Sequence, residues 1–279
     1  MRVVTFLRDL FSTTCFYPID FGRFTERLSK QSLSQPSSDE KLQKLLSQWG
    51  VASRRRSEQL ITDGHITVNG IKAHIGQRAN PAVDDIRIDG RLISPENRPD
   101  KYYVLLNKPR GVVSTCDDPQ GRKTVIDLLP QRLRQDGIRL HPVGRLDTDS
   151  TGALLLTNHG QLTQTLTHPR HHISKTYRVR VQGSPTHASL TQWRDGINLA
   201  GRLTAPADVK VLNPKPPALL EIVLREGRNR QIRRVAEQLG HPVLSLHRSR
   251  IGCINLGDLP PGQYRHLIPR ELKILLNLL

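Results

Sequence analysis

The sequence has few cysteines and few acidic residues, and it has no long apolar run. It has three cysteines, Cys15, Cys116 and Cys253. They form no C-x-x-C pair, and none of them is near a histidine at the spacing of metal ligands. This pattern argues against a disulfide framework and a structural zinc, and it favours a reducing compartment, which we take to be the cytoplasm. No apolar run approaches the ~18 residues that would span a bilayer, so no membrane segment is predicted.

The shortage of acidic residues gives the chain a strong positive charge. Forty-two Lys and Arg against 25 Asp and Glu leave a net charge of +17 in 279 residues. Such a chain usually binds a polyanion, because neutralising phosphates releases condensed counterions. A solvated basic surface or a membrane-facing patch is the alternative, but no long amphipathic basic helix or lipidation signal accompanies the charge. We therefore expect a nucleic-acid partner.

Residues 1–38 differ in composition from the rest of the chain. They mix isolated aromatic residues with Arg and Ser and end in the polar run SKQSLSQPSS. A transit peptide is poor in acidic residues, yet Asp9, Asp20 and Glu26 lie here. We expect a poorly ordered extension over residues 1–38 rather than an organellar import signal.

Residues 39–95 predict a small helix–helix–hairpin unit. Leucines from Leu42 onward recur at helical spacing until Gly50, which can end the helix. Ser53 can cap a second helix that ends near Gly64. The segments HITVNGIKAH and IRIDGRLI then place NG and DG between short alternating runs, which is the strongest short-range hairpin signal.

Three consecutive arginines, Arg54, Arg55 and Arg56, begin the second predicted helix. Positive charge at a helix N-terminus opposes the helix dipole, so these residues favour phosphate contact, with a solvated charge cluster as the alternative. The stretch from EKLQKLL to NGIKA resembles the RNA-binding module shared by a small-subunit ribosomal protein and several RNA-modifying enzymes. The resemblance implies that Ser53 and the three arginines face RNA.

Residues 101–279 predict a larger α+β domain with a mixed, mostly antiparallel sheet and flanking helices. A linker containing proline, ISPENRPD, precedes it. The apolar or alternating segments YYVLLN, VVST, ALLLTN, KTYRVRVQG and ALLEIVL are expected strands, and NRQIRRVAEQLG is an expected helix that ends at Gly240.

Two charged segments of this domain are candidate functional sites. Asp147 lies in the polar loop HPVGRLDTDSTG before a buried strand, where catalytic groups often lie, although an Asp here is more often a turn or cap residue. The segment REGRNRQIRR crowds five arginines around one Glu, so they repel one another. RNA phosphates are the expected partner, with Arg228 and Arg230 as candidate contacts. A solvated helix face is the alternative for Arg233.

Four stretches, in the same order, resemble the pseudouridine synthase family that acts on ribosomal RNA: LNKPRGVVSTCDDPQGRKTVIDLLP, GRLDTDSTGALLLTNHG, KTYRV and REGRNRQIRR. The resemblance implies that Asp147 is the nucleophile. It implies that Tyr177 stacks on the flipped base and assists proton removal, although Tyr is also common in strands. Arg233 would pair with the Asp147 carboxylate, and Arg145 would hold the flipped nucleotide or its neighbouring phosphates.

The implied reaction gains and loses no atoms, so neither cofactor nor metal is required. We expect a monomer whose partner is ribosomal RNA or a pre-ribosomal particle. Two other functions remain open. A non-catalytic RNA-binding or ribosome-assembly protein needs only the charge and the N-terminal module. A methyltransferase would need a glycine-rich loop between a strand and a helix, and the sequence offers none.

Overall fold

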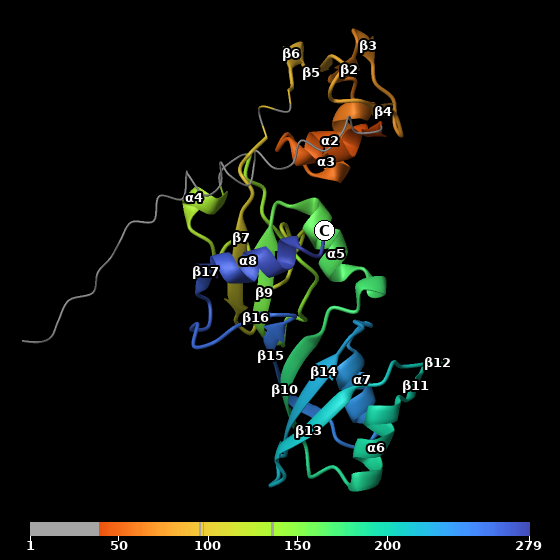
Figure 1. Ribbon diagram of the computed structural model, residues 1–279, viewed down its shortest axis with the longest axis vertical. Helices are drawn as coiled ribbons and strands as arrows, with labels where there is room; N and C mark the ends of the chain where they lie inside the picture. The colour runs from red at the N-terminus through yellow and green to blue at the C-terminus, as the bar shows by residue number, and fades with distance from the viewer. Residues whose placement is uncertain (1–38, 95, 97, 135–136) are drawn as a thin grey trace, which may run out of the picture.

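The computed structural model describes residues 39–94, 96, 98–134 and 137–279. The expected extension over residues 1–38 lies outside the described residues, and so does part of the predicted linker. The described residues form a small N-terminal unit above a long twisted sheet with helices on its faces (Figure 1). Among them, no helix is both long and apolar enough to cross a membrane. The α+β class predicted from the sequence is confirmed.

The N-terminal unit contains the two helices and the two tight turns that the sequence predicts. The Ser53 hydroxyl accepts a hydrogen bond from the Arg56 amide at 3.2 Å and caps the second helix. Asn69 and Asp89 have left-handed backbone conformations and each precedes a glycine, as tight hairpin turns require. The elements are β1 (Glu40–Lys41), α2 (Leu42–Gln48), α3 (Arg54–Thr62), β2 (Ile66–Val68), β3 (Ile71–Lys72), β4 (Arg78–Ala79), β5 (Ile86–Ile88) and β6 (Arg91–Leu92).

This unit has a hydrophobic core of its own, built from the apolar faces of α2 and α3 against the sheet β3-β2-β5-β6. It also contacts the rest of the chain. The Arg139 guanidinium donates to the carbonyl oxygens of Gly50 and Val51 at 2.8 and 2.7 Å. A Cβ on Gly50 would lie 2.5 Å from the Gly137 carbonyl oxygen, so the close approach requires glycine here. The separate unit over residues 39–95 remains a prediction that this core supports.

The main sheet has the order β13-β14-β10-β15-β9-β7-β17, with β16 on β15 and β8 on β9. Its pairs are antiparallel except β15 with β9. The part of the chain that contains this sheet, together with the separate hairpin of β11 and β12, has the following elements: β7 (Tyr103–Lys108), α4 (Gln131–Arg134), β8 (His141–Pro142), β9 (Thr151–Thr157), α5 (Gly160–Thr167), η2 (Pro169–His171), β10 (Lys175–Val181), α6 (His187–Asp195), β11 (Asn198–Leu199), β12 (Arg202–Leu203), β13 (Asp208–Asn213), β14 (Leu219–Leu224), α7 (Gln231–Gln238), β15 (Val243–Ile251), β16 (Ile254–Asn255), β17 (Tyr264–His266) and α8 (Pro269–Leu276).

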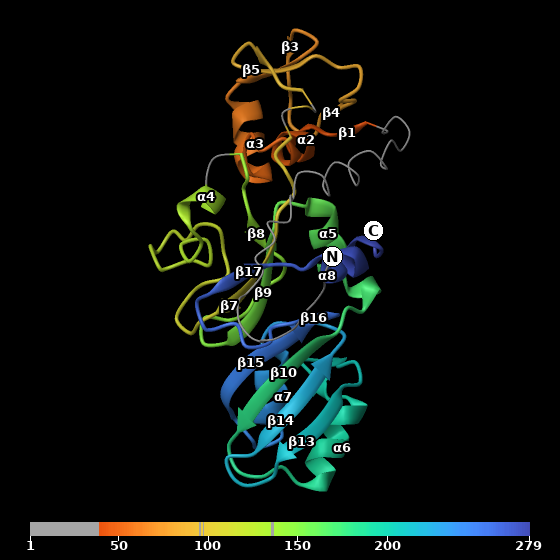
Figure 2. The ribbon, with the colours of Figure 1, turned by 60° about the vertical axis from the view of Figure 1, so that its left-hand side comes forward.

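Burial patterns explain which strands lie in the middle of the sheet. Strands β7 and β9 are buried almost throughout and have apolar clusters on both faces. Strands β10 and β14 alternate instead, because α6 and α7 cover one face only. Figure 2 shows these two helices against the lower half of the sheet, with β10 and β15 crossing toward the upper half.

The parallel pairing of β9 with β15 joins the two halves of the sheet. Gly152 pairs with Arg248 at this junction and has φ of 107°. A Cβ on Gly152 would lie 2.2 Å from the Arg248 carbonyl oxygen, so no other residue fits without moving a strand. The junction therefore fixes where the loop before β9 lies relative to β15 and α7.

One predicted strand is wrong. The segment VVST contributes only an isolated bridge between Val113 and Thr124. The Ser114 hydroxyl instead exchanges hydrogen bonds with the backbone of Leu146, donating to its carbonyl oxygen at 2.8 Å and accepting from its amide at 3.2 Å. This side chain ties the segment to the loop before β9, a contact that alternation of apolar residues does not reveal.

Candidate active site

Asp147 lies in the loop Arg145–Ser150, which joins β8 to β9. A hydrogen bond of 3.0 Å from the Ser150 amide to the Asp147 carbonyl oxygen closes a turn within it. The turn leaves the Asp147 side chain 34% exposed. Because Leu146 is buried and bonded to Ser114, the backbone just before Asp147 is fixed. The structure therefore gives Asp147 both a turn position and access to a cavity.

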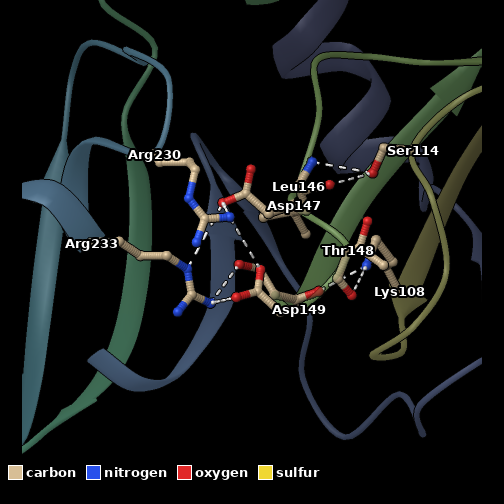
Figure 3. A network of polar contacts seen from close by, with 9 residues as sticks. Lys108, Ser114, Leu146, Asp147, Thr148, Asp149, Arg230 and Arg233 are labelled. Carbon is tan, nitrogen blue, oxygen red and sulfur yellow. Dashed lines mark hydrogen bonds and ion pairs between the residues drawn. The ribbon is translucent and has the colours of Figure 1, made fainter. Parts of the chain in front are cut away.

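A fully buried lysine, Lys108, supports this loop from below (Figure 3). Its ammonium group donates to the carbonyl oxygens of Ser150, Pro109 and Thr148 at 2.8, 3.0 and 3.4 Å. Burial lowers the pKa of Lys108 to about 8, although the charges of Asp149 and Asp147 act in the opposite direction. No role was predicted for Lys108, because nothing in the sequence distinguishes a buried lysine in a strand from an exposed one.

Two arginines from the beginning of α7 face this loop (Figure 3). Arg230 lies 3.7 Å from the Asp147 carboxylate and 3.8 Å from that of Asp149. The Arg233 guanidinium, 14% exposed, lies 3.0 Å from Asp149 and 3.9 Å from Asp147. Arg230 has a left-handed backbone with φ of 49°, which costs roughly 1–2 kcal/mol in a residue other than glycine. Such strain is typical of functional sites.

The predicted pairing of Arg233 with Asp147 is present but long, and Asp149 is the closer partner. Arg233 also donates to the Ser150 hydroxyl at 3.1 Å. The Arg233 Nε atom and the Asp149 Oδ1 atom are buried and have no hydrogen-bond partner among the described residues. Catalytic hydrogen bonds are often long until substrate binds. Asp149 had no predicted role, although its spacing of two from Asp147 in a turn was a usable signal.

A cavity of about 360 Å³ opens beside Asp147. Tyr177 of β10 lines it, half-buried, and so contributes an aromatic ring to the same space as the carboxylate. The structure thus brings together residues from three distant segments that the sequence singled out. The predicted site residues that line this cavity are Arg145, Asp147, Tyr177, Arg228, Arg230 and Arg233.

Arg228 has a structural task that its sequence context did not reveal. It pairs with Glu226 at 3.1 Å, donates to the Arg202 carbonyl oxygen at 2.9 Å and also donates to that of Leu203. These bonds hold the β11–β12 hairpin beside the cavity. Arg228 therefore stabilises local structure, and its predicted contact with RNA stays a prediction. Arg145, in contrast, is exposed and forms no ion pair among the described residues.

A second hollow, of about 760 Å³, shares Arg145, Asp147 and Arg230 with the first. Arg55 of the N-terminal unit lines it together with Arg145 and Arg230. The structure thus brings Arg55 of the arginine run to the same hollow as Asp147. Arg54 and Arg56 are exposed but line neither hollow, and Ser53 uses its hydroxyl for helix capping.

Among the described residues, no group of three or more His, Cys, Asp or Glu side chains could hold a metal ion. The site is instead a carboxylate pair facing arginines at the mouth of a cavity with an aromatic wall. Such an arrangement suits nucleophilic chemistry on a polyanionic substrate.

Comparison with known proteins gives the family. The RNA pseudouridylate synthase family matches residues 102–238, and the S4 domain matches residues 40–81. The chain is 40% identical over 241 residues to ribosomal large subunit pseudouridine synthase B of Bacillus subtilis, covering 84% of this chain and 94% of that protein. It is 35% identical over 244 residues to the dual-specificity RNA pseudouridine synthase RluF of Escherichia coli, covering 88% and 81%.

A solved pseudouridylate synthase structure is similar over 84% of this chain and 99% of its own, with a TM-score of 0.62 and 30% identity. The chain therefore belongs to the RNA pseudouridylate synthase family and is an isomerase that acts on RNA. Membership of this family of enzymes decides against the methyltransferase and the non-catalytic binding protein.

The burial of Lys108 makes a prediction about stability and pH. Its folded pKa of about 8 lies below the ordinary 10.5, so between these values the unfolded chain binds the additional proton. Stability should therefore rise with pH in this window. The unfolding free energy of the wild type minus that of Lys108→Met should increase by about 2–3 kcal/mol from pH 7 to pH 10.

Denaturant titrations at each pH would measure this difference. Lys123→Met, which removes an exposed lysine, is the matched control. A difference for Lys108→Met that does not change with pH would show that Lys108 keeps its proton equally well in the folded and unfolded chains.

Proposed function

We propose that this protein isomerises a specific uridine of ribosomal RNA to pseudouridine, with Asp147 as the nucleophile, by base flipping and without a cofactor. The observation that carries the proposal is the position of Asp147, which lies between two arginines and a cavity lined by Tyr177. The choice of ribosomal RNA rests on the B. subtilis relative, whose name refers to the large ribosomal subunit.

The chemistry requires a nucleophile that can also leave. A carboxylate oxygen of Asp147 attacks the target nucleotide, the glycosidic bond from C1′ to N1 breaks, and the uracil turns. A new bond from C1′ to C5 then forms and releases the carboxylate, while C5 loses a proton and N1 gains one. Atoms balance without a redox partner. A carboxylate fits this role because it is both a usable nucleophile and a good leaving group.

The two arginines place positive charge beside the Asp147 carboxylate, which is partly removed from water. A poorly solvated anion costs several kcal/mol unless it is paired. Arg230 and Arg233 lie 3.7 and 3.9 Å from Asp147, distances at which they attract its carboxylate but leave its oxygens free to react. Asp149 takes the shorter contact with Arg233 and so holds that guanidinium in place.

Base flipping is expected because the Asp147 carboxylate lies at the mouth of a cavity. A uridine that is stacked in a helix or loop would have to leave its stack to enter this cavity, at a cost of a few kcal/mol. The Tyr177 ring offers a stacking surface inside the cavity that offsets part of this cost. Outside it, Arg55, Arg145 and Arg230 line the second hollow and are placed for phosphates that flank the target. We propose a monomer that works in the cytoplasm on ribosomal RNA or a pre-ribosomal particle.

The two neighbouring carboxylates allow a matched test. Asp147→Asn keeps the shape but removes the nucleophile, so it should lower the single-turnover rate by ~10³-fold or more. Asp149→Asn removes only the closer partner of Arg233 and should cost roughly 10–100-fold. RNA affinity should change little in either variant. The measurement is pseudouridine formed in unmodified ribosomal RNA at saturating protein. If the two variants lost the same factor in single-turnover rate, or if Asp147→Asn kept a rate within tenfold of the wild type, the assignment of Asp147 as the nucleophile would be contradicted.

Arg55 and Arg56 offer a second matched pair, since both are exposed neighbours in α3 but only Arg55 lines the second hollow. Arg55→Ala should weaken RNA binding and lower the slope of log affinity against log salt by roughly 0.7–0.9. Arg56→Ala should change the slope less. Salt titrations of binding to ribosomal RNA would measure both. Identical slopes for the wild type and Arg55→Ala would show that Arg55 contacts no phosphate.

A further inference from the structure

Arg248 of β15 is a buried arginine that has no part in the catalytic and RNA-binding roles proposed above. The residue as a whole is only 4% exposed. Its Nε atom donates to the Ala153 carbonyl oxygen at 2.7 Å. Its Nη2 atom is buried and has no hydrogen-bond partner among the described residues, and no carboxylate there forms an ion pair with it. Burying an unpaired charge costs several kcal/mol, so packing alone does not account for an arginine here.

The position of Arg248 connects it to the reaction. It lines the same cavity as Asp147 and Tyr177, and Lys175 lines that cavity as well. Burial lowers the pKa of Lys175, and the Arg248 charge lowers it further. Among the described residues that line the cavity, Arg248 and Lys175 form no ion pair, whereas Glu226 pairs with Arg228 and Asp147 faces Arg230 and Arg233.

The proposed reaction supplies a negative charge for this position. When the bond from C1′ to N1 breaks, its electron pair remains with the uracil and spreads over N1 and the two carbonyl oxygens. The charge disappears when C5 bonds to C1′, C5 loses its proton and N1 gains one. A fixed donor that faces developing charge in a water-poor site stabilises the transition state more than the bound substrate.

We propose that Arg248 is a further catalytic residue, whose guanidinium donates to a carbonyl oxygen of the flipped uracil and stabilises the anionic base while it is detached. This inference rests on the proposed function. A phosphate oxygen is the other acceptor that a nucleotide offers. Arg55 and Arg145, which are exposed, are the residues that we propose for phosphates, whereas Arg248 is buried and lines the cavity that we propose for the base.

The test combines a change in the protein with a change of one substrate atom. Synthetic stem–loop RNAs would carry the uridine that the wild type converts, as uridine, 2-thiouridine or 4-thiouridine. Arg248→Met should lower the single-turnover rate on uridine by ~10²-fold or more, with RNA affinity changed less than threefold, and Arg248→Lys should recover part of the rate. Arg180→Met is the control, because Arg180 is exposed on β10 and lines neither hollow.

The decisive result is the coupling between the two changes. One thio substitution should slow the wild type but have no further effect in Arg248→Met, since the contact to that oxygen is already gone. A merely structural role would lower the rate equally on all three RNAs, and that result would overturn the proposal. Loss of RNA affinity, with coupling to a phosphorothioate beside the target, would also overturn it in favour of a phosphate contact.

The outcomes also separate this inference from the proposed function. A wild type that converts no uridine defeats both. A wild type that is active and depends on Asp147, but shows no coupling between Arg248 and either carbonyl oxygen, defeats this inference alone. Melting temperatures of the variants near that of the wild type would show that the rates are measured on folded protein.

Discussion

Two carboxylates in one turn face two arginines from the first turn of a helix, and the rest of the site depends on this arrangement. Asp147 and Asp149 come from the loop before β9, whereas Arg230 and Arg233 come from α7. A partly buried charge is costly unless it is paired, and here each carboxylate faces both arginines. The contacts to Asp147 are longer and leave it able to react, while Asp149 has the shorter contact to Arg233.

The fold supplies the rigidity that such a network needs. Gly152 lets β9 lie against β15 at the parallel junction, which sets the distance from the Asp147 loop to α7. Lys108 holds the backbone of the loop from below, and Ser114 holds the residue before Asp147. Loops placed by a rigid scaffold are where catalytic groups are usually found, and this loop is fixed at three points. The N-terminal unit adds Arg55, which lines a hollow together with Asp147 and Arg230.

Local features were predictable from the sequence, and long-range pairings were not. The Ser53 cap, the Asn69 turn and the buried strand β9 follow from residue type and spacing over a few positions. The residues around the cavity were found through the resemblance of their motifs to a family. The preference of Arg233 for Asp149, the use of Arg228 to hold a hairpin and the burial of Lys108 each depend on a partner far away in the chain. Periodicity and composition contain no information about such partners.

The central claim is that this chain makes pseudouridine in ribosomal RNA through Asp147. The most direct measurement is a pseudouridine map of ribosomal RNA from cells with and without the protein. The account predicts that at least one pseudouridine disappears without it, and that the wild type restores it but Asp147→Asn does not. A map that is identical in the two kinds of cells, or one that Asp147→Asn restores in full, would contradict the account.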